Sequence, residues 1–216
     1  MSRVLQKVSS RLFLTMVMQN SSVTTGILAG GLATRIGGNK GLQNLHSRAL
    51  ISWVLEVVKP DSEVVMINAN AEQAAYANFG CRVIADQLPD WPGPLAGLHA
   101  ALLCSNTEYV MTVPCDTPFL PGNLLRRLIA AQELNASEVA VAVVAGRRQP
   151  TIALYNRKVL AKLERFLSSD KRKVNDWLES LRLSEVVFDN VEDFENINTL
   201  EDLARVQQLP LRAGNK

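Results

Sequence analysis

The chain has 216 residues, of which 47% are hydrophobic and 20% are charged, and its formal net charge is +2. This length and composition suit one domain with a sizeable core and exclude an intrinsically disordered chain. The charge is too small to predict binding to nucleic acid or to an anionic membrane. The cysteines, Cys81, Cys104 and Cys115, have neither the spacing of a metal site nor the even number of a disulfide framework. We therefore expect reduced cysteines in a cytoplasmic protein.

The N-terminal 23 residues differ in pattern from the rest. Arg3, Lys7 and Arg11 precede a largely apolar run at 12–18, which mimics a secretory signal. The run is at the short limit for such a signal, lacks a clear cleavage site, and is too short to cross a bilayer. We expect residues 1–23 to be a poorly ordered extension, with a targeting signal as the alternative. Residues 24–210 are expected to form the domain and 211–216 a tail.

The first predicted element is a buried strand that ends over residues 26–29 and leads into a glycine-rich loop at 30–41. The loop has paired glycines near both ends, Arg35 in the middle and Lys40 at the far end. Glycine lets backbone N–H groups approach a ligand closely, and the two cations suit phosphate oxygens. The loop matches neither the P-loop nor the dinucleotide-binding pattern. We interpret it as a polyphosphate site, with a flexible surface loop as the alternative.

Predicted strands and helices alternate along the rest of the chain. Helices are expected at 50–58 with Ser47 as cap, 71–77, 95–103, from Pro121 onward, 157–167, 174–181, and after Asn198, where Asn198 or Thr199 is the cap. Strands are expected at 63–67, 81–85, 109–113, 139–144, 151–155, 185–188 and near Phe194. This alternation predicts an α/β fold, a single three-layer doubly wound domain with a mostly parallel sheet and some antiparallel strands over 139–155.

Polar residues follow several predicted strands. Asn68 ends the second strand, Asp86 the third, and Asp116 follows the strand at 109–113. Because ligands of doubly wound sheets bind at the carboxyl ends of the strands, we expect these residues to share one edge with the glycine loop. The carboxylate of Asp116 suits Mg²⁺, which takes few protein ligands besides substrate phosphates. Asp116 could instead be a helix N-cap or an Asx-turn residue, and Asn68 and Asp86 could instead satisfy backbone donors at the strand ends.

A turn rich in proline and glycine at 92–97 leads into a predicted helix. Gly93 and Gly97 permit close backbone approach, and a helix N-terminus favours an anion. We interpret Gly97 as a packing position beside the base or ribose of a nucleotide. Such turns are also common in ordinary loops.

Several blocks of the chain resemble one family. Residues 28–41 read L-A-G-G-x3-R-I-G-G-x-K-G, which resembles the signature of nucleotidyltransferases that activate phosphorylated metabolites with a nucleoside triphosphate. Further blocks follow in that family's order, at 67–70, Asp86, 92–97, 114–118, 150–154 and 196–199. Together they cover about residues 25–203. Within that superfamily the chain is most similar to the molybdenum cofactor guanylyltransferases.

This resemblance implies a Rossmann-like nucleotidyltransferase fold and a reaction. GMP would pass from GTP to the terminal phosphate of molybdopterin, with release of pyrophosphate. The implied catalytic residues are Lys40, Arg35 and Asp116, of which Asp116 would also bind the cofactor Mg²⁺. The implied nucleotide-binding residues are Leu28, Ala29, Gly30, Gly31, Lys40, Asn68, Asp86, Gly97 and Asp116.

The second substrate is also anionic and must bind opposite the nucleotide. The resemblance assigns Asn196 and Asn198 to this acceptor side. The cationic clusters add Arg148, Arg172 and Lys173, with a solvated surface as the alternative. The expected partners are GTP, molybdopterin, and proteins that insert molybdenum or act as molybdoenzyme chaperones. We expect no nucleic acid or membrane partner, and a monomer or weak oligomer.

The chain departs from the family pattern at three places. Asn39 stands where an aspartate is common, Gln149 where a histidine is common, and Ser47-Arg48-Ala49 where Gly-Lys-Pro is usual. The last change puts any role of that segment in doubt. Two other functions stay open: a cytidylyltransferase for a related pterin, sugar or isoprenoid phosphate, and a non-catalytic protein that delivers the cofactor. The blocks at 92–97 and 150–154 favour guanine.

Overall fold

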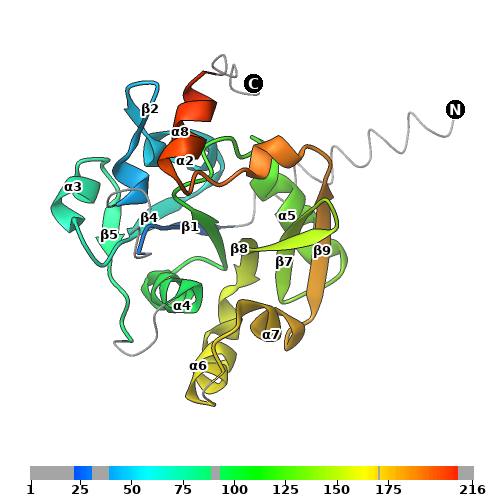
Figure 1. Ribbon diagram of the computed structural model, residues 1–216. Coiled ribbons are helices and arrows are strands. Elements are labelled where there is room, and N and C mark those ends of the chain that lie inside the picture. The colour runs from blue at the N-terminus through cyan, green and yellow to red at the C-terminus, as the bar shows by residue number, and fades with distance from the viewer. Residues whose placement is uncertain (1–21, 31–38, 89–92, 170, 209–216) are drawn as a thin grey trace, which may run out of the picture.

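The computed structural model describes residues 22–30, 39–88, 93–169 and 171–208. Within these ranges a seven-stranded sheet has the strand order β5-β4-β1-β6-β8-β7-β9 (Figure 1). Neighbouring strands are parallel except at β8, which is antiparallel to both β6 and β7. This confirms the α/β fold and the antiparallel strands expected over 139–155. The strands are β1 (Val23–Leu28), β4 (Val64–Asn68), β5 (Arg82–Ile84), β6 (Tyr109–Pro114), β7 (Val139–Val144), β8 (Arg147–Asn156) and β9 (Leu183–Phe188).

Helices cover both faces of the sheet, and the sequence of β7 shows why they must. Its side chains alternate between two cores: Val139 and Val141 belong to one, Ala140 and Ala142 to the other. A strand buried on both faces needs an unbroken apolar run, which Val-Ala-Val-Ala-Val-Val supplies. The helices are α2 (Leu50–Val58), α3 (Gln73–Ala77), α4 (Pro94–Cys104), α5 (Leu124–Leu134), α6 (Leu160–Ser168), α7 (Val174–Glu179) and α8 (Leu200–Gln207).

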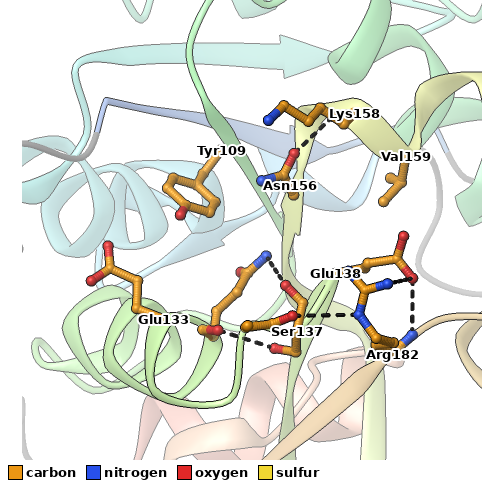
Figure 2. A pocket seen from close by; sticks show the side chains of 10 residues that line it. Tyr109, Glu133, Ser137, Glu138, Asn156, Lys158, Val159 and Arg182 are labelled. Atoms are coloured by element: carbon orange, nitrogen blue, oxygen red, sulfur yellow. Dashed lines mark hydrogen bonds and ion pairs between the residues drawn. The ribbon is translucent and has the colours of Figure 1, made fainter.

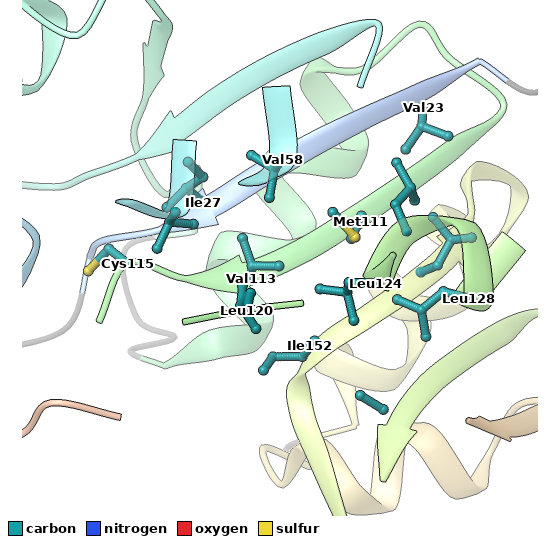
Figure 3. Packing of buried hydrophobic residues seen from close by; sticks show 14 of the residues in the cluster. Val23, Ile27, Val58, Met111, Val113, Cys115, Leu120, Leu124, Leu128 and Ile152 are labelled. Atoms are coloured by element: carbon teal, nitrogen blue, oxygen red, sulfur yellow. The ribbon is translucent and has the colours of Figure 1, made fainter. Parts of the chain in front are cut away.

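The two cores lie on opposite faces of the sheet. In the first, Val58 of α2 and Leu124 and Leu128 of α5 pack with Ile27 of β1 and Met111 of β6 (Figure 3). The second core joins α4, α6 and α7 to the other face. The result is three layers, as the alternation of elements predicts. Among the described residues, no helix combines the length and the apolar character needed to span a membrane.

Two local predictions are wrong. Ser47 does not cap α2; it has a φ of 64° in the turn between β2 (Asn44–Leu45) and β3 (Arg48–Ala49), and Ala49 precedes the helix. In that hairpin Arg48 lies over the ring of Trp53, 4.2 Å from its centroid. The segment near Phe194 is a 3₁₀ helix, η4 (Val191–Phe194), rather than a strand. Asn190 donates to Asp193 across this turn, and Phe194 buries its ring against Phe188.

The last helix begins as expected. Thr199 accepts from the backbone N–H of Asp202, and the Asp202 carboxylate accepts from the Thr199 N–H, which completes a capping box. Helix α8 then packs beside β2 through Leu45 and Val206. This brings the 196–198 segment close to Lys40. The expectations for residues 1–21 and 209–216 lie outside the described residues.

Candidate functional site

The carboxyl ends of β1, β4 and β6 meet at one edge of the sheet. Leu28 at the end of β1 is in register with Asn68 on one side and Pro114 on the other. Backbone hydrogen bonds continue past the strands, from Ala29 N to Asn68 O (2.8 Å) and from Cys115 N to Leu28 O (3.1 Å). The segments that follow the three strands therefore leave the sheet side by side. This is the edge at which ligands of doubly wound folds bind.

A cation and an acid meet at this edge. Lys40 begins the short 3₁₀ helix η1 (Lys40–Leu42), and its Nζ lies 3.1 Å from Asp116 Oδ2 and 2.5 Å from Asn198 Oδ1. The Asp116 side chain is 10% exposed and that of Lys40 is 26% exposed. Partial removal from water strengthens the attraction between the two charges. The expectation that Lys40 and Asp116 lie at a common edge is confirmed.

Residues far away in the sequence complete this group. Ile197 N donates to the carbonyl oxygen of Asp116 (2.9 Å), and Thr117 Oγ1 donates to Asn196 Oδ1 (2.6 Å). These bonds hold the 196–198 segment against the turn after β6. We call Lys40, Asp116, Thr117, Asn196 and Asn198 the Lys40–Asp116 cluster. It joins predicted nucleotide-side and acceptor-side residues in one place.

A second polar group lies at the ends of β4 and β5. Asn68 Nδ2 donates to Asp86 Oδ1 (2.9 Å), and Asn70 Nδ2 donates to Asp86 Oδ2 (2.8 Å). The backbone N–H of Asp86 in turn donates to Asn70 Oδ1 (2.9 Å). We call Asn68, Asn70 and Asp86 the Asp86 cluster. Sequence analysis assigned no role to Asn70, and the signal available was its place two residues beyond Asn68 in the block at 67–70.

Two glycines bring the backbone close to the Asp86 cluster. A Cβ at Gly97 would lie 2.6 Å from Asn68 Oδ1 and 2.8 Å from Leu28 Cδ2. A Cβ at Gly30 would lie 3.0 Å from Asn70 Nδ2. Close approach rather than positive φ therefore disfavours a larger residue at both positions, more strongly at Gly97 than at Gly30. Helix α4 and the segment after β1 both pack directly on this cluster.

A buried aromatic residue, Tyr76, packs next to the turn that carries Lys40. A Cβ at Gly41 would lie 2.9 Å from Tyr76 Oη and 3.2 Å from Cys115 Cβ. Tyr76 is fully buried, and its hydroxyl has no hydrogen-bond partner among the described residues. Burial, followed by the charge of Asp116, raises the pKa of the Cys115 thiol to about 12. Burial also raises the pKa of Tyr76. Both groups are therefore neutral at pH 7 and act through packing.

The remaining predicted site residues either lie outside the described residues or make their contacts outside the two clusters. Gly31 and Arg35 lie outside the described residues. Arg148 pairs with Glu185 (2.6 Å) and Glu179 (3.6 Å). Arg172 donates to the Leu167 carbonyl oxygen (2.9 Å), and Lys173 is the exposed residue before α7. The acceptor role of Arg148, Arg172 and Lys173 stays a prediction.

A separate cavity of about 420 Å³ lies at the opposite edge of the sheet, where β6 and β7 begin and β8 ends (Figure 2). Tyr109, Asn156 and Arg182 are among its lining residues. Glu138 pairs there with Lys162, whose hydrogen bond lowers the pKa of that carboxyl. No predicted site residue lines this cavity. We therefore place the candidate active site at the carboxyl edge.

Comparison with known proteins shows which family the chain is similar to. The family described as "MobA-like NTP transferase domain" matches residues 25–186. The molybdenum cofactor guanylyltransferase of Cupriavidus taiwanensis is 42% identical over 193 residues, covering 87% of this chain and 97% of the relative. That of Shewanella sp. (strain ANA-3) is 40% identical over 182 residues, covering 83% and 92%.

A solved structure shows the same fold. The molybdopterin-guanine dinucleotide biosynthesis protein A of Archaeoglobus fulgidus superposes with a TM-score of 0.71 at 26% identity, covering 85% of this chain and 96% of that one. The strand order, the edge at which the polar clusters lie and these relatives lead to one assignment. The chain belongs to the family of molybdenum cofactor guanylyltransferases.

Proposed function

We propose that this protein transfers GMP from GTP to the terminal phosphate of molybdopterin, releases pyrophosphate, and so forms the guanine dinucleotide form of the molybdenum cofactor. Family membership supports the reaction. The observation that carries it is the 3.1 Å contact between Lys40 Nζ and Asp116 Oδ2 at the carboxyl edge of the sheet. A lysine cation beside a largely buried carboxylate offers one partner for a triphosphate and one for its metal ion.

Asp116 fits a divalent cation, which we propose to be Mg²⁺. Its carboxylate offers hard oxygen atoms. Among the described residues, no group of three or more His, Cys, Asp or Glu side chains could hold a metal by itself. This suits Mg²⁺, which commonly takes one or two carboxylates and completes its shell with phosphate and water. When bound, the ion would neutralise charge on the triphosphate.

The chain itself supplies positioning and charge. Lys40 can exchange its contact with Asp116 for a phosphate oxygen and offset charge on the departing pyrophosphate. Backbone groups of Leu28, Ala29 and Gly30 lie at the same edge, where they can approach the nucleotide. The acceptor phosphate is already anionic, so the displacement at the α-phosphorus needs no general base. Catalysis then consists of alignment and charge stabilisation.

The acceptor side begins at Asn198. This residue contacts Lys40 Nζ (2.5 Å), so a group bound by Asn198 would lie next to the reacting phosphates. Asn196 is fixed nearby through Thr117. We propose that these two amides orient the molybdopterin phosphate. Arg148, Arg172 and Lys173 remain candidates for binding the rest of this substrate.

The Asp86 cluster is our proposed base site. Guanine presents the N1–H and N2–H donors, and a carboxylate accepts from both. The relatives named above are guanylyltransferases, which favours guanine over the cytidine alternative. We further propose that the reaction takes place in the cytoplasm, with molybdenum-inserting proteins and molybdoenzyme chaperones as partners. The three free cysteines are consistent with a reducing compartment.

The direct test is incubation of purified protein with GTP, Mg²⁺ and molybdopterin. We expect pyrophosphate release that depends on both Mg²⁺ and the pterin, and a pterin whose mass has grown by one GMP unit. CTP in place of GTP should support little turnover. Preferential transfer of CMP, or nucleotide binding without pyrophosphate release, would contradict the proposal.

A further inference from the structure

Asn70 makes two hydrogen bonds with Asp86, the proposed base-reading residue. Its side-chain amide bonds Asp86 twice: Nδ2 donates to Oδ2 (2.8 Å), and Oδ1 accepts from the Asp86 backbone N–H (2.9 Å). We propose that Asn70 is a positioning residue for nucleobase selection, which holds the Asp86 carboxylate in the orientation that accepts guanine. This inference rests on the proposed function and adds a residue with its own role to it.

The two bonds form a closed ring between Asn70 and Asp86. One bond fixes the backbone of Asp86 and the other fixes its carboxylate, so the side chain cannot rotate without breaking a charge-assisted bond. Asn68 Nδ2 donates to the second oxygen, Oδ1 (2.9 Å). Each carboxylate oxygen thus accepts one protein donor and retains acceptor capacity for a ligand. The hydrogen bonds from Asn68 and Asn70 therefore fix the orientation of the Asp86 carboxylate.

A carboxylate with a fixed plane distinguishes the bases by their hydrogen-bonding edges. Guanine offers two adjacent donors, N1–H and the N2 amino group, which match two oxygen atoms. Adenine and cytosine offer one amino donor beside an acceptor nitrogen, which would face a carboxylate oxygen with no proton between them. A carboxylate that is free to rotate could avoid this mismatch. Selection therefore depends on what holds Asp86 as well as on Asp86 itself.

Asn70 also contacts a second segment of the proposed nucleotide site. It follows β4, and a Cβ at Gly30 would lie 3.0 Å from its Nδ2. The segment after β1, which leads to the phosphate side, therefore packs against the same amide that orients Asp86. Asn70 is itself exposed, in contrast to the buried Asn68. Its conformation is thus set by these polar contacts rather than by core packing.

The test compares GTP with inosine triphosphate, which keeps N1–H but lacks the N2 amino group. We expect the wild-type protein to favour GTP in kcat/KM for pyrophosphate release with molybdopterin as acceptor. Asn70→Ala should lower the ratio of kcat/KM for GTP to that for ITP by about tenfold, chiefly through the GTP term. Asn70→Asp keeps the acceptor for the Asp86 N–H but places an oxygen against Oδ2, so its ratio should fall at least as far.

The matched control is Asn78→Ala, which removes an exposed asparagine at the end of α3 and should leave the ratio unchanged. Both nucleotides are assayed on one preparation, so partial unfolding of a variant cancels from the ratio. If a variant turns over too slowly for kcat/KM to be measured, the ratio of the dissociation constants for GTP and ITP is compared instead.

The outcomes separate the two proposals. An unchanged ratio in Asn70→Ala, with a ratio that collapses in Asp86→Ala, would overturn the role of Asn70 and leave base reading by Asp86 intact. An unchanged ratio in both variants would overturn both roles. Absence of GTP-dependent turnover in the wild-type protein would instead contradict the proposed function.

Discussion

Substitution of Gly41 by alanine tests whether packing beneath the Lys40–Asp116 cluster sets its geometry. The new Cβ would lie 2.9 Å from Tyr76 Oη, 3.2 Å from Tyr76 Cε1 and 3.2 Å from Cys115 Cβ. All of these atoms are buried, so none can move into solvent. Overpacking of this kind costs about 1–3 kcal/mol of the free energy of unfolding. Because Gly41 follows Lys40 directly, part of the strain should displace the turn that carries Lys40.

The expected kinetic effect is similar in size to the stability effect. A displacement on the order of 1 Å in a positioned group can lower turnover by about a hundredfold, so we expect Gly41→Ala to lose between about tenfold and a hundredfold in kcat. The measurement is pyrophosphate release at saturating GTP, Mg²⁺ and molybdopterin, with chemical denaturation to follow stability. A variant that is fully active yet destabilised would show that the contact serves folding alone.

A second substitution should relieve the first. Tyr76→Phe removes the nearest atom, and because that hydroxyl has no hydrogen-bond partner among the described residues, its loss should change the free energy of unfolding little. The double variant Gly41→Ala/Tyr76→Phe should therefore recover part, not all, of the lost turnover, since Cys115 Cβ remains close. Tyr109→Phe, at the opposite edge of the sheet, is the matched control and should give no recovery. A double variant no better than Gly41→Ala would refute the reasoning.

Three further predictions follow from the site. Lys40→Met or Asp116→Asn should lower kcat by about a hundredfold or more, because each loses charge stabilisation of the reacting phosphates; near-normal turnover of either folded variant would contradict the roles assigned. Gly97→Ala, whose Cβ would meet Asn68 Oδ1 at 2.6 Å, should raise KM for GTP more than it lowers kcat, and an unchanged KM would count against a base site there. Cys115 should resist alkylation at pH 8 in the folded protein, since burial raises the pKa of its thiol to about 12, while the other two cysteines react; rapid labelling of all three would show that this region opens.

Much of the fold could be predicted because it depends on local pattern. The unbroken apolar run at 139–144 indicates a strand covered on both faces, and polar residues at strand ends mark the ligand-binding edge. The mistakes arose where tertiary contacts override such patterns. Ser47 looks like a cap but lies in a hairpin turn, and Phe194 belongs to a 3₁₀ helix whose ring packs on Phe188.

The candidate site, like the fold, could be predicted from the sequence only in part. Lys40, Asp116 and Asp86 could be found because loop composition and resemblance indicated them. The support that orients them could not be found, because Asn70 acts through a bond pattern and Tyr76 through a contact that only the folded chain creates. Nor does any local signal predict that Asn198 reaches Lys40.

The most direct test of the central claim is a crystal structure of the protein with Mg²⁺ and a non-reactive GTP analogue. We predict the metal ion on Asp116, Lys40 Nζ on a phosphate oxygen, and the guanine edge on the Asp86 carboxylate. A nucleotide bound away from this edge, for example in the cavity beside Tyr109 and Arg182, would contradict the account.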